Sequence, residues 1–242
     1  MSPSLQARSL ATRARLLEAG RVAFSRRGHD GVNLTTDILA PAGVSAGSFY
    51  HQFVDKTDLL LAILDEAASE RKATVFGGGH DDGSRRSFDI DVAEAIERFF
   101  VSLDDEGHLW RIQLRERDSS EPRIRQRVLD GRRAWQQEVA RLLSPHNRRG
   151  DAALAQAVEL VNIFGIGLIA AYLDLPPEVR SARRAALPQQ VSEFLCRGVR
   201  PLLGIPQPRK GKRVAPQEMK ERSTPPLDTM PDRSRGSVPG RS

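Results

Sequence analysis

The sequence predicts an all-α protein of about nine helices. Three observations lead to this class: apolar residues recur at helical spacing as far as Gly204, segments with period-2 alternation are missing, and no Asn-Gly turn joins two apolar runs. With 39% hydrophobic residues, the 242-residue chain has enough apolar side chains to bury a core. We therefore expect helices joined by short breakers rather than a sheet.

The first four expected helices lie before residue 75. The first carries an apolar face that includes Leu16 and Phe24, and it ends at Gly28. The fourth places Leu60 and Leu64 at helical spacing. The expected ranges are Ser9–Arg27, Thr35–Ala40, Ala46–Phe53 and Lys56–Thr74.

Five more helices are expected after a polar loop that runs from Gly77 to about Asp91. Pro122 suits the first turn of a helix, because its missing N–H has no partner there in any case. After Gly204 large apolar residues become rare, which predicts a disordered tail. The expected ranges are Val92–Asp104, His108–Asp118, Pro122–Leu143, Asp151–Leu173 and Ala182–Leu203.

The formal net charge of +6 is concentrated at the C-terminus. From Ile205 onward, nine Lys and Arg residues stand against four acidic ones, which gives this tail +5 and leaves +1 for the rest of the chain. A nucleic-acid partner must therefore be argued from local patches and not from the overall charge.

Cysteine usage and apolar run lengths indicate the compartment. The single cysteine, Cys196, excludes an internal disulfide framework, and a buried inert thiol is favoured over a redox sensor. The apolar run from Ile163 to Leu175 is too short for a membrane span, and the N-terminus does not read as a secretory signal. A cytoplasmic protein without a membrane partner is expected.

Two short helices around Gly43 form the most informative segment. Helices this short melt alone, so Ile38 and Phe49 are expected to brace them against neighbours. Gly43 permits the positive φ that ends the first helix, and Ser45 caps the second. Pro41 is expected to end the first helix early. The pattern predicts a helix-turn-helix, whose second helix enters the DNA major groove.

This segment resembles the tetracycline-repressor (TetR) family over about Thr12 to Leu64. The sequence departs from the family at Ala46, where relatives often carry lysine. The resemblance implies a homodimer through the last two helices, a palindromic double-stranded DNA operator, and an unknown small-molecule effector. The matching residues are Leu16-Leu17-Glu18-Ala19, Asp37-Ile38-Leu39, Ala42-Gly43-Val44-Ser45, Gly47-Ser48-Phe49-Tyr50-His51, Phe53, Lys56 and Leu59.

The residues expected to contact DNA lie in and beside this motif. Hydroxyl, imidazole and ammonium groups donate to phosphates, and small residues at the start of the second helix suit close approach to the bases. Phe49 and Phe53 are expected in the core, and for Tyr50 a phosphate contact is favoured over packing alone. The expected DNA-binding residues are Thr35, Thr36, Ser45, Ala46, Gly47, Ser48, Tyr50, His51 and Lys56.

The helices after Val92 are expected to bind the effector and to form the dimer. The helix Asp151–Leu173 is apolar around much of its circumference, which is typical of a helix buried on several sides. The alternative is a central core helix of a monomer. Gly165 and Gly167 would allow another helix to approach closely. The expected effector-binding residues, each with ordinary core packing as its alternative, are Phe99, Leu103, Trp110, Arg111, Leu114, Trp135 and Phe164.

Three common catalytic and cofactor-binding motifs are missing from the sequence, which argues against an enzyme. There is no Gly-x-Ser-x-Gly elbow, no phosphate-binding glycine loop and no paired metal motif, so no catalytic residue, metal or cofactor is expected. A sequence-specific DNA-binding transcriptional regulator, a repressor released by a small and largely apolar effector, is favoured. The alternative is a helical-bundle interaction or sensor protein without operator-specific binding. The expected domains are residues 1–56 for DNA binding, 57–204 for effector binding and dimerisation, and 205–242 as a disordered basic tail.

Overall fold

A computed structural model of the chain describes residues 5–77 and 87–207, and every regular element in those ranges is helical, which confirms the all-α class. The compact unit extends to Gln207, and the predicted tail lies outside the described residues from Pro208 onward. The elements are α1 (Leu5–Gly31), η1 (Leu34–Leu39), α2 (Ala40–Ala42), α3 (Ala46–Tyr50), α4 (Lys56–Phe76), α5 (Phe88–Asp105), α6 (Gly107–Glu116), α7 (Pro122–Leu143), η2 (Ser144–His146), α8 (Asp151–Leu173), α9 (Pro177–Arg183) and α10 (Leu187–Leu203).

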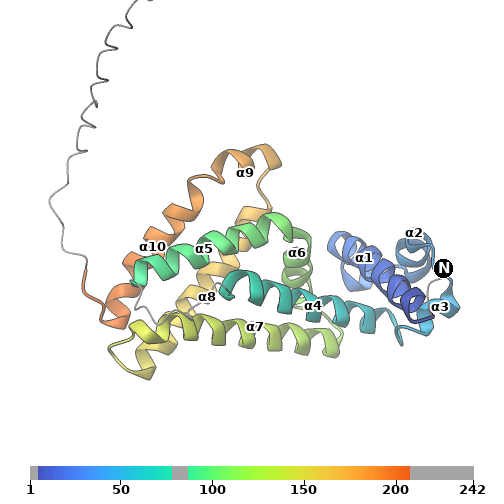
Figure 1. Ribbon diagram of the computed structural model, residues 1–242, viewed down its shortest axis with the longest axis horizontal. Coiled ribbons are helices and arrows are strands. Elements are labelled where there is room, and N and C mark those ends of the chain that lie inside the picture. The colour runs from blue at the N-terminus through green and yellow to red at the C-terminus, as the bar shows by residue number, and fades with distance from the viewer. Residues whose placement is uncertain (1–4, 78–86, 208–242) are drawn as a thin grey trace, which may run out of the picture. The chain divides into compact units, whose positions relative to one another are not determined.

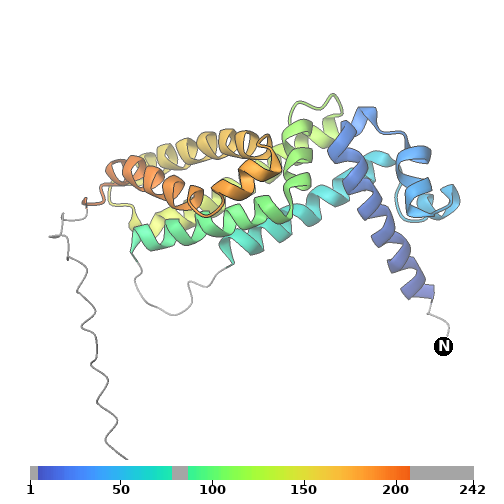
Figure 2. The same ribbon diagram turned by 90° about the horizontal axis from the view of Figure 1, so that it is seen from above.

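Two hydrophobic cores lie along α4. The helices α1, η1, α2 and α3 gather at the start of α4 and bury Phe24 and Phe49 completely (Figure 1). The helices α5, α7, α8 and α10 enclose the second core around Phe100 and Tyr172. Figure 2 shows α10 running beside α5, in agreement with the contacts between these helices. Because α4, α6 and α7 contribute residues to both cores, these three helices join them mechanically.

The helix-turn-helix differs from the expectation at Pro41. The first short helix continues to Ala42 instead of ending early, and Gly43 stops it with a φ of 61°. The reason lies in η1, whose i→i+5 hydrogen bonds include the one from the Ala40 N–H to the Thr35 carbonyl. Pro41 therefore falls in the first turn of a new α segment, α2, where no N–H donor is needed.

Two further boundaries differ from the expected ones. The helix expected at Ala182–Leu203 is two helices, α9 and α10, and Pro188 lies in the first turn of α10. The helix α5 begins four residues before Val92, because Ser87 caps it by accepting from the Ile90 N–H. The expected polar loop is shorter than predicted on that side, and its residues 78–86 lie outside the described residues.

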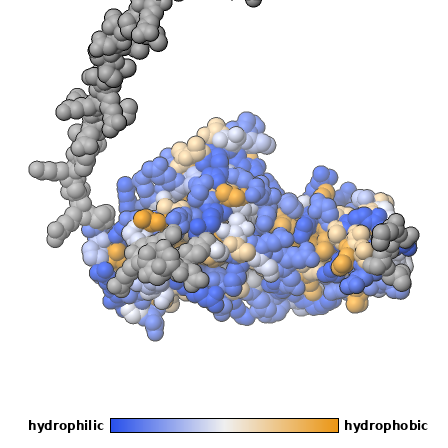
Figure 3. Space-filling model, viewed as in Figure 1, coloured by the Kyte–Doolittle hydropathy of each residue, from blue (hydrophilic) through white to orange (hydrophobic). Residues whose placement is uncertain are grey.

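The helix α8 has the expected bounds, but much of its apolar surface is exposed in the single chain. By length and composition alone, its 23 residues, with a mean hydropathy of 1.8 in their most apolar window, are long and apolar enough to cross a membrane. The uninterrupted apolar run within this helix, from Ile163, is shorter than a membrane span, as expected. Only 22% of this window is buried in the chain, and Leu160 and Ile163 are exposed. The face drawn in Figure 3 is mostly hydrophilic, with hydrophobic residues in small patches.

Candidate DNA-binding surface and effector cavity

The start of η1 is held by a reciprocal cap. The Asn33 side chain accepts from the backbone N–H groups of Thr35 and Thr36 at 3.0 and 3.2 Å, while Asp37 accepts from the Asn33 N–H at 2.9 Å. Thr35 and Thr36 are exposed, so their hydroxyl groups face away from the core. Asn33 was absent from the expected site, although Asn directly before a helix is a recognisable start signal.

The start of α3 presents small, exposed residues. Ser45 accepts from the Ser48 N–H at 3.2 Å, as expected for the cap, and its hydroxyl lies 3.0 Å from that of Ser48. Ala46 and Gly47 are exposed, and a Cβ placed on Gly47 would meet no described atom within 4 Å. This end of the helix can therefore approach a binding partner closely.

The aromatic residues in α3 and directly after it fall into a buried and an exposed group. Phe49 and Phe53 are buried in the first core, which confirms their packing role. Tyr50 is 61% exposed, with its ring edge-on to Phe49 at 5.2 Å, and His51 is exposed beside it. Tyr50 and His51 are thus accessible to solvent at the C-terminal end of α3.

Lys56, which is expected to contact a DNA phosphate, also stabilises the end of α1. Its ammonium donates to the carbonyl of His29 at 2.9 Å and to that of Val32 at 3.1 Å, and so closes the end of α1. One of its three N–H donors remains for a phosphate. The first turn of α4 also holds the carboxylates of Asp55 and Asp58, which accept from backbone N–H groups at this helix start. Fewer donors are available there than the sequence suggests.

The first turns of α1 lie beside α3 and add polar groups that sequence reasoning missed. The Gln52 amide donates to the Ser9 hydroxyl at 2.7 Å, and the Arg13 guanidinium lies 4.6 Å from the centre of the Phe53 ring. Arg15 donates to the Ala42 carbonyl at 3.2 Å and so supports the end of α2. Arg8 is exposed in the same part of α1. A basic stretch thereby borders the recognition helix.

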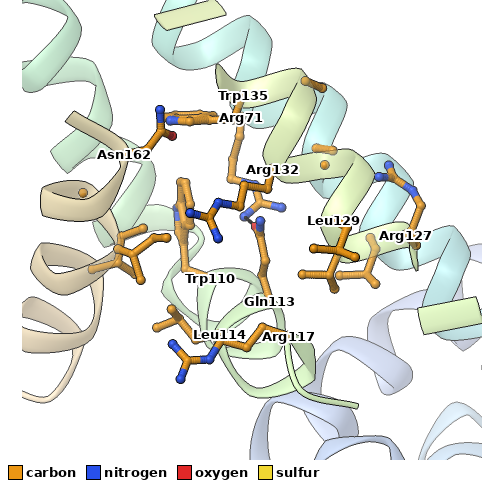
Figure 4. Close-up of a pocket in the computed structure, with 18 of the residues that line it drawn as sticks. Arg71, Trp110, Gln113, Leu114, Arg117, Arg127, Leu129, Arg132, Trp135 and Asn162 are labelled. Atoms are coloured by element: carbon orange, nitrogen blue, oxygen red, sulfur yellow. Dashed lines mark hydrogen bonds between the residues drawn. The ribbon is translucent and has the colours of Figure 1, made fainter. Parts of the chain in front are cut away.

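A cavity of about 420 Å³ opens between α4, α6, α7 and α8 (Figure 4). Four of the expected effector-binding residues line it: Phe99, Trp110, Leu114 and Trp135. Their rings form one cluster, in which Trp110 lies 5.6 Å from both Phe99 and Trp135. The wall facing these rings includes Asn162 from α8.

The other three expected effector-binding residues lie outside this cavity. Leu103 is completely buried in the second core. Arg111 points away from the cavity, where it donates to the Leu173 carbonyl and pairs with Asp174 at 3.5 Å. Phe164 lines a separate cavity of about 80 Å³ and stacks on Phe194 at 5.2 Å. These residues lie on helices that contribute to the cavity wall, but helical spacing could not resolve which side of each helix faces the cavity.

The most important lining residue that the sequence analysis missed is Arg71 of α4. Only 4% of this arginine is exposed. Its Nε donates to the Ala67 carbonyl at 2.9 Å, and its guanidinium lies 4.3 Å from the centre of the Trp110 ring. Sequence spacing carried a signal for it, because Arg71 follows Leu64 and Ala67 on the apolar face of α4.

The fold and the exposed helix-turn-helix define a DNA-binding regulator. The sequence model for the bacterial regulatory proteins of the tetR family matches residues 16–63. No curated protein matches the sequence. These residues run from α1 into α4 and include the helix-turn-helix, so this part of the chain is similar to the regulators of the tetR family.

Solved structures of the same fold cover most of the described chain. A TetR-family transcriptional regulator from Streptomyces coelicolor is 26% identical, with a TM-score of 0.60, over 84% of this chain and 95% of that one. A tetR-family regulatory protein from Rhodococcus RHA1 is 18% identical, with a TM-score of 0.63, over 81% and 98%. FadR from Bacillus subtilis, solved in complex with stearoyl-CoA, is 18% identical, with a TM-score of 0.57, over 75% and 96%.

Proposed function

We propose that this regulator is a homodimeric repressor that leaves its operator when a small, largely apolar effector fills the cavity of about 420 Å³. The observation that carries the proposal is the position of α6, which forms one wall of this cavity and also packs against α1. An effector that moves α6 would therefore act directly on the helix that supports the helix-turn-helix.

The contacts of α6 divide between the two sides of that helix. Gln113 and Leu114 line the cavity, whereas Ile112 belongs to the first core. The next turn carries Glu116, which accepts from the His29 N–H at 2.7 Å in a buried hydrogen bond. The His29 imidazole continues the connection to the Thr57 hydroxyl of α4 at 2.9 Å. These bonds connect α6 to the start of α4 and to the point near Gly28 where α1 departs from helical geometry.

Tight packing at the break in α1 makes this connection sensitive to movement. Gly28 has a φ of 70°, and a Cβ there would lie 2.8 Å from Arg115 and 3.2 Å from Glu116. A small shift of α6 therefore cannot be absorbed by empty space at Gly28. Closely packed elements of this kind transmit displacements instead of damping them.

The apolar surfaces of α8 and α10 support a dimer. Leu160 and Ile163 of α8 and Phe194 of α10 are 47%, 55% and 62% exposed. Exposed apolar side chains of this size are typical of a surface that another protein subunit buries. Gly167 lies on the exposed side of α8, and nothing described lies within 4 Å of a Cβ placed on it. Two-fold pairing through these helices would place two α3 helices on the two halves of a palindromic operator.

DNA contacts are assigned from the exposed groups of the helix-turn-helix. Thr35, Thr36, Tyr50, His51 and the remaining Lys56 donor anchor phosphates. The residues of the α3 start, Ser45, Ala46, Gly47 and Ser48, face the bases.

The alternative is a sensor protein of this fold without operator-specific binding. A selection of fragments from the source genome by the purified protein at moderate salt separates the two. A regulator retains intergenic fragments that share a two-fold symmetric sequence, and the alternative retains none above random DNA.

A further inference from the structure

Arg71 is a buried cation at the wall of the cavity. Besides the bond from its Nε to the Ala67 carbonyl, its Nη1 donates to the Gln113 side chain at 2.5 Å. A guanidinium has five N–H donors, and these two bonds leave the Nη2 group without an acceptor among the described residues. Figure 4 shows Arg71, Gln113 and Arg132 turned into the cavity.

No carboxylate lies within ion-pair distance of Arg71 among the described residues. Burial lowers the pKa of Arg71 to about 10, so the group is still charged at neutral pH. The main acidic influence on it is Glu106, whose own carboxyl has a raised pKa because it is partly buried. A buried charge without a bonded counter-ion is costly, and in proteins such a charge is normally paired.

Of the other four cations that line the cavity, three are paired with described carboxylates and Arg132 is not. Lys72 pairs with Glu138 at 2.7 Å, Arg117 pairs with Asp118 at 2.8 Å, and Arg127 pairs with Asp65. Arg132 has no hydrogen bond or ion pair with any described residue. The cavity therefore holds two guanidinium groups, those of the buried Arg71 and the exposed Arg132, that pair with no carboxylate in the described part of the chain.

The same cavity has an aromatic wall next to these cations. Phe99, Trp110 and Trp135 pack edge to face or at a tilt, with Phe99 and Trp135 6.1 Å apart. The guanidinium of Arg71 lies over Trp110, so the charged and the apolar parts of the wall meet at one residue. A ligand that matches both parts has an anionic end and an apolar body.

We propose that the cavity binds an anionic amphiphile, whose carboxylate or phosphate group is held by Arg71 and Arg132 and whose apolar body lies against Trp110 and Trp135. This inference rests on the proposed role of the cavity as the effector site, and it names the chemical class of the effector. A bidentate bond from the free edge of Arg71 would supply the counter-ion that residues 5–77 and 87–207 do not provide.

Fluorescence of the two tryptophans tests the proposal on the full chain. Both tryptophans of the sequence line this cavity, so the whole intrinsic tryptophan signal reports on it. The probes are decanoate, decyl phosphate and 1-decanol, each titrated below the concentration at which it forms micelles. They share one apolar chain and differ at the head group, and the two anions distinguish a carboxylate site from a phosphate site.

We expect at least one anion to bind about tenfold or more tightly than 1-decanol, as a charge-assisted hydrogen bond implies. Arg71→Met should reduce that preference to about threefold or less, whereas Arg71→Lys should keep most of it. The matched control is Arg98→Met, which removes an arginine that also donates to a backbone carbonyl, that of Val75, but lies outside the cavity. This control should keep the full preference.

The outcomes separate this inference from the proposed function. Equal binding of 1-decanol and both anions, or an unchanged preference in Arg71→Met, would overturn the anionic class while leaving an apolar effector site in place. If no probe changes the fluorescence, the effector site itself is wrong, and this inference fails with it. Should Arg71→Met not fold, as judged by circular dichroism, Arg132→Met gives the same comparison from the more exposed cation.

Discussion

The side chain of Lys56 holds the end of α1 through the carbonyls of His29 and Val32. Lys56→Ala removes both bonds and leaves two acceptors partly buried, so the free energy of unfolding should fall by about 1–3 kcal/mol. The salt dependence of operator binding should also fall by about one phosphate contact if the third donor reaches the DNA. Urea denaturation and operator titrations at several salt concentrations measure the two effects.

The control for this prediction is Arg8→Ala, which changes an exposed cation of α1 and should leave the stability within about 0.5 kcal/mol of the parent. An unchanged unfolding free energy in Lys56→Ala would contradict the capping role. Unchanged stability together with a reduced salt slope would mean that DNA contact is the whole role of Lys56.

The thiol of Cys196 should be inert in the folded protein. Burial and a hydrogen-bonding contact with Asp89 raise its pKa to about 12, so only a fraction on the order of 10⁻⁴ is thiolate at pH 8. Reaction with a disulfide reagent at pH 8 should be very slow and should become fast in concentrated urea. Fast modification of the folded chain would favour the redox-sensor alternative.

Single residues near a cavity were the least predictable part of the site. Trp110 and Trp135 were predictable because large aromatic residues at helical spacing seldom lie far from a core. Arg71 was missed because arginine is rarely buried, and only the completed fold shows that it lines the cavity. The outward direction of Arg111 depends on how the end of α8 packs beside α6, which local sequence does not determine.

At the scale of elements, two glycines of the helix-turn-helix should respond in opposite ways. Gly43→Ala forces a side chain into a φ of 61° and should lower the free energy of unfolding by about 1 kcal/mol. Gly47→Ala places a methyl group inside α3, where no described atom lies within 4 Å, and should raise it by about 0.5–1 kcal/mol.

Operator binding by Gly47→Ala shows whether Gly47 lies in the DNA contact surface or affects only the stability of α3. Gly47→Ala should weaken operator binding despite the gain in stability, because the methyl group keeps α3 from approaching the bases. Thermal unfolding followed by circular dichroism and operator titration of the same samples provide the two readouts. A Gly47→Ala protein that is more stable and binds its operator as tightly as the parent would remove Gly47 from the DNA contact surface.

Elements with strong local signals were predicted closely. The bounds of α7 and α8 agree with the sequence analysis, because Pro122 marks a helix start and the apolar periodicity is long. The separation of α9 from α10 was missed because Arg183 and Arg184 continue a helical pattern through the break. The i→i+5 bonding of η1 was also not predictable, since it reflects how Pro41 is fitted into the turn.

At the scale of the whole molecule, the exposed face of α8 should form the dimer. Gly167→Leu adds a side chain at an exposed position where a Cβ meets no described atom within 4 Å, so the subunit should fold normally while dimerisation and operator binding weaken together. Gly167 is a cleaner position than Gly165, which lines both cavities. Sedimentation at micromolar concentration measures the oligomeric state.

The control for the dimer is Val22→Glu, which changes an exposed valine of α1, beside Ile163→Glu on α8. Only the change on α8 should produce monomers. A parent protein that is monomeric at micromolar concentration and still binds its operator tightly would exclude this interface.

The placement of α3 in the major groove is the central claim, and titration of single-base operator variants tests it most directly. Ser48→Ala should change the preference at one position in each half-site, because Ser48 lies at the exposed start of α3. Tyr50→Phe removes one hydroxyl from a 61% exposed ring and should weaken all variants about equally. If Ser48→Ala lowers the affinity for every variant equally while Tyr50→Phe alters base preference, α3 does not read the groove as described.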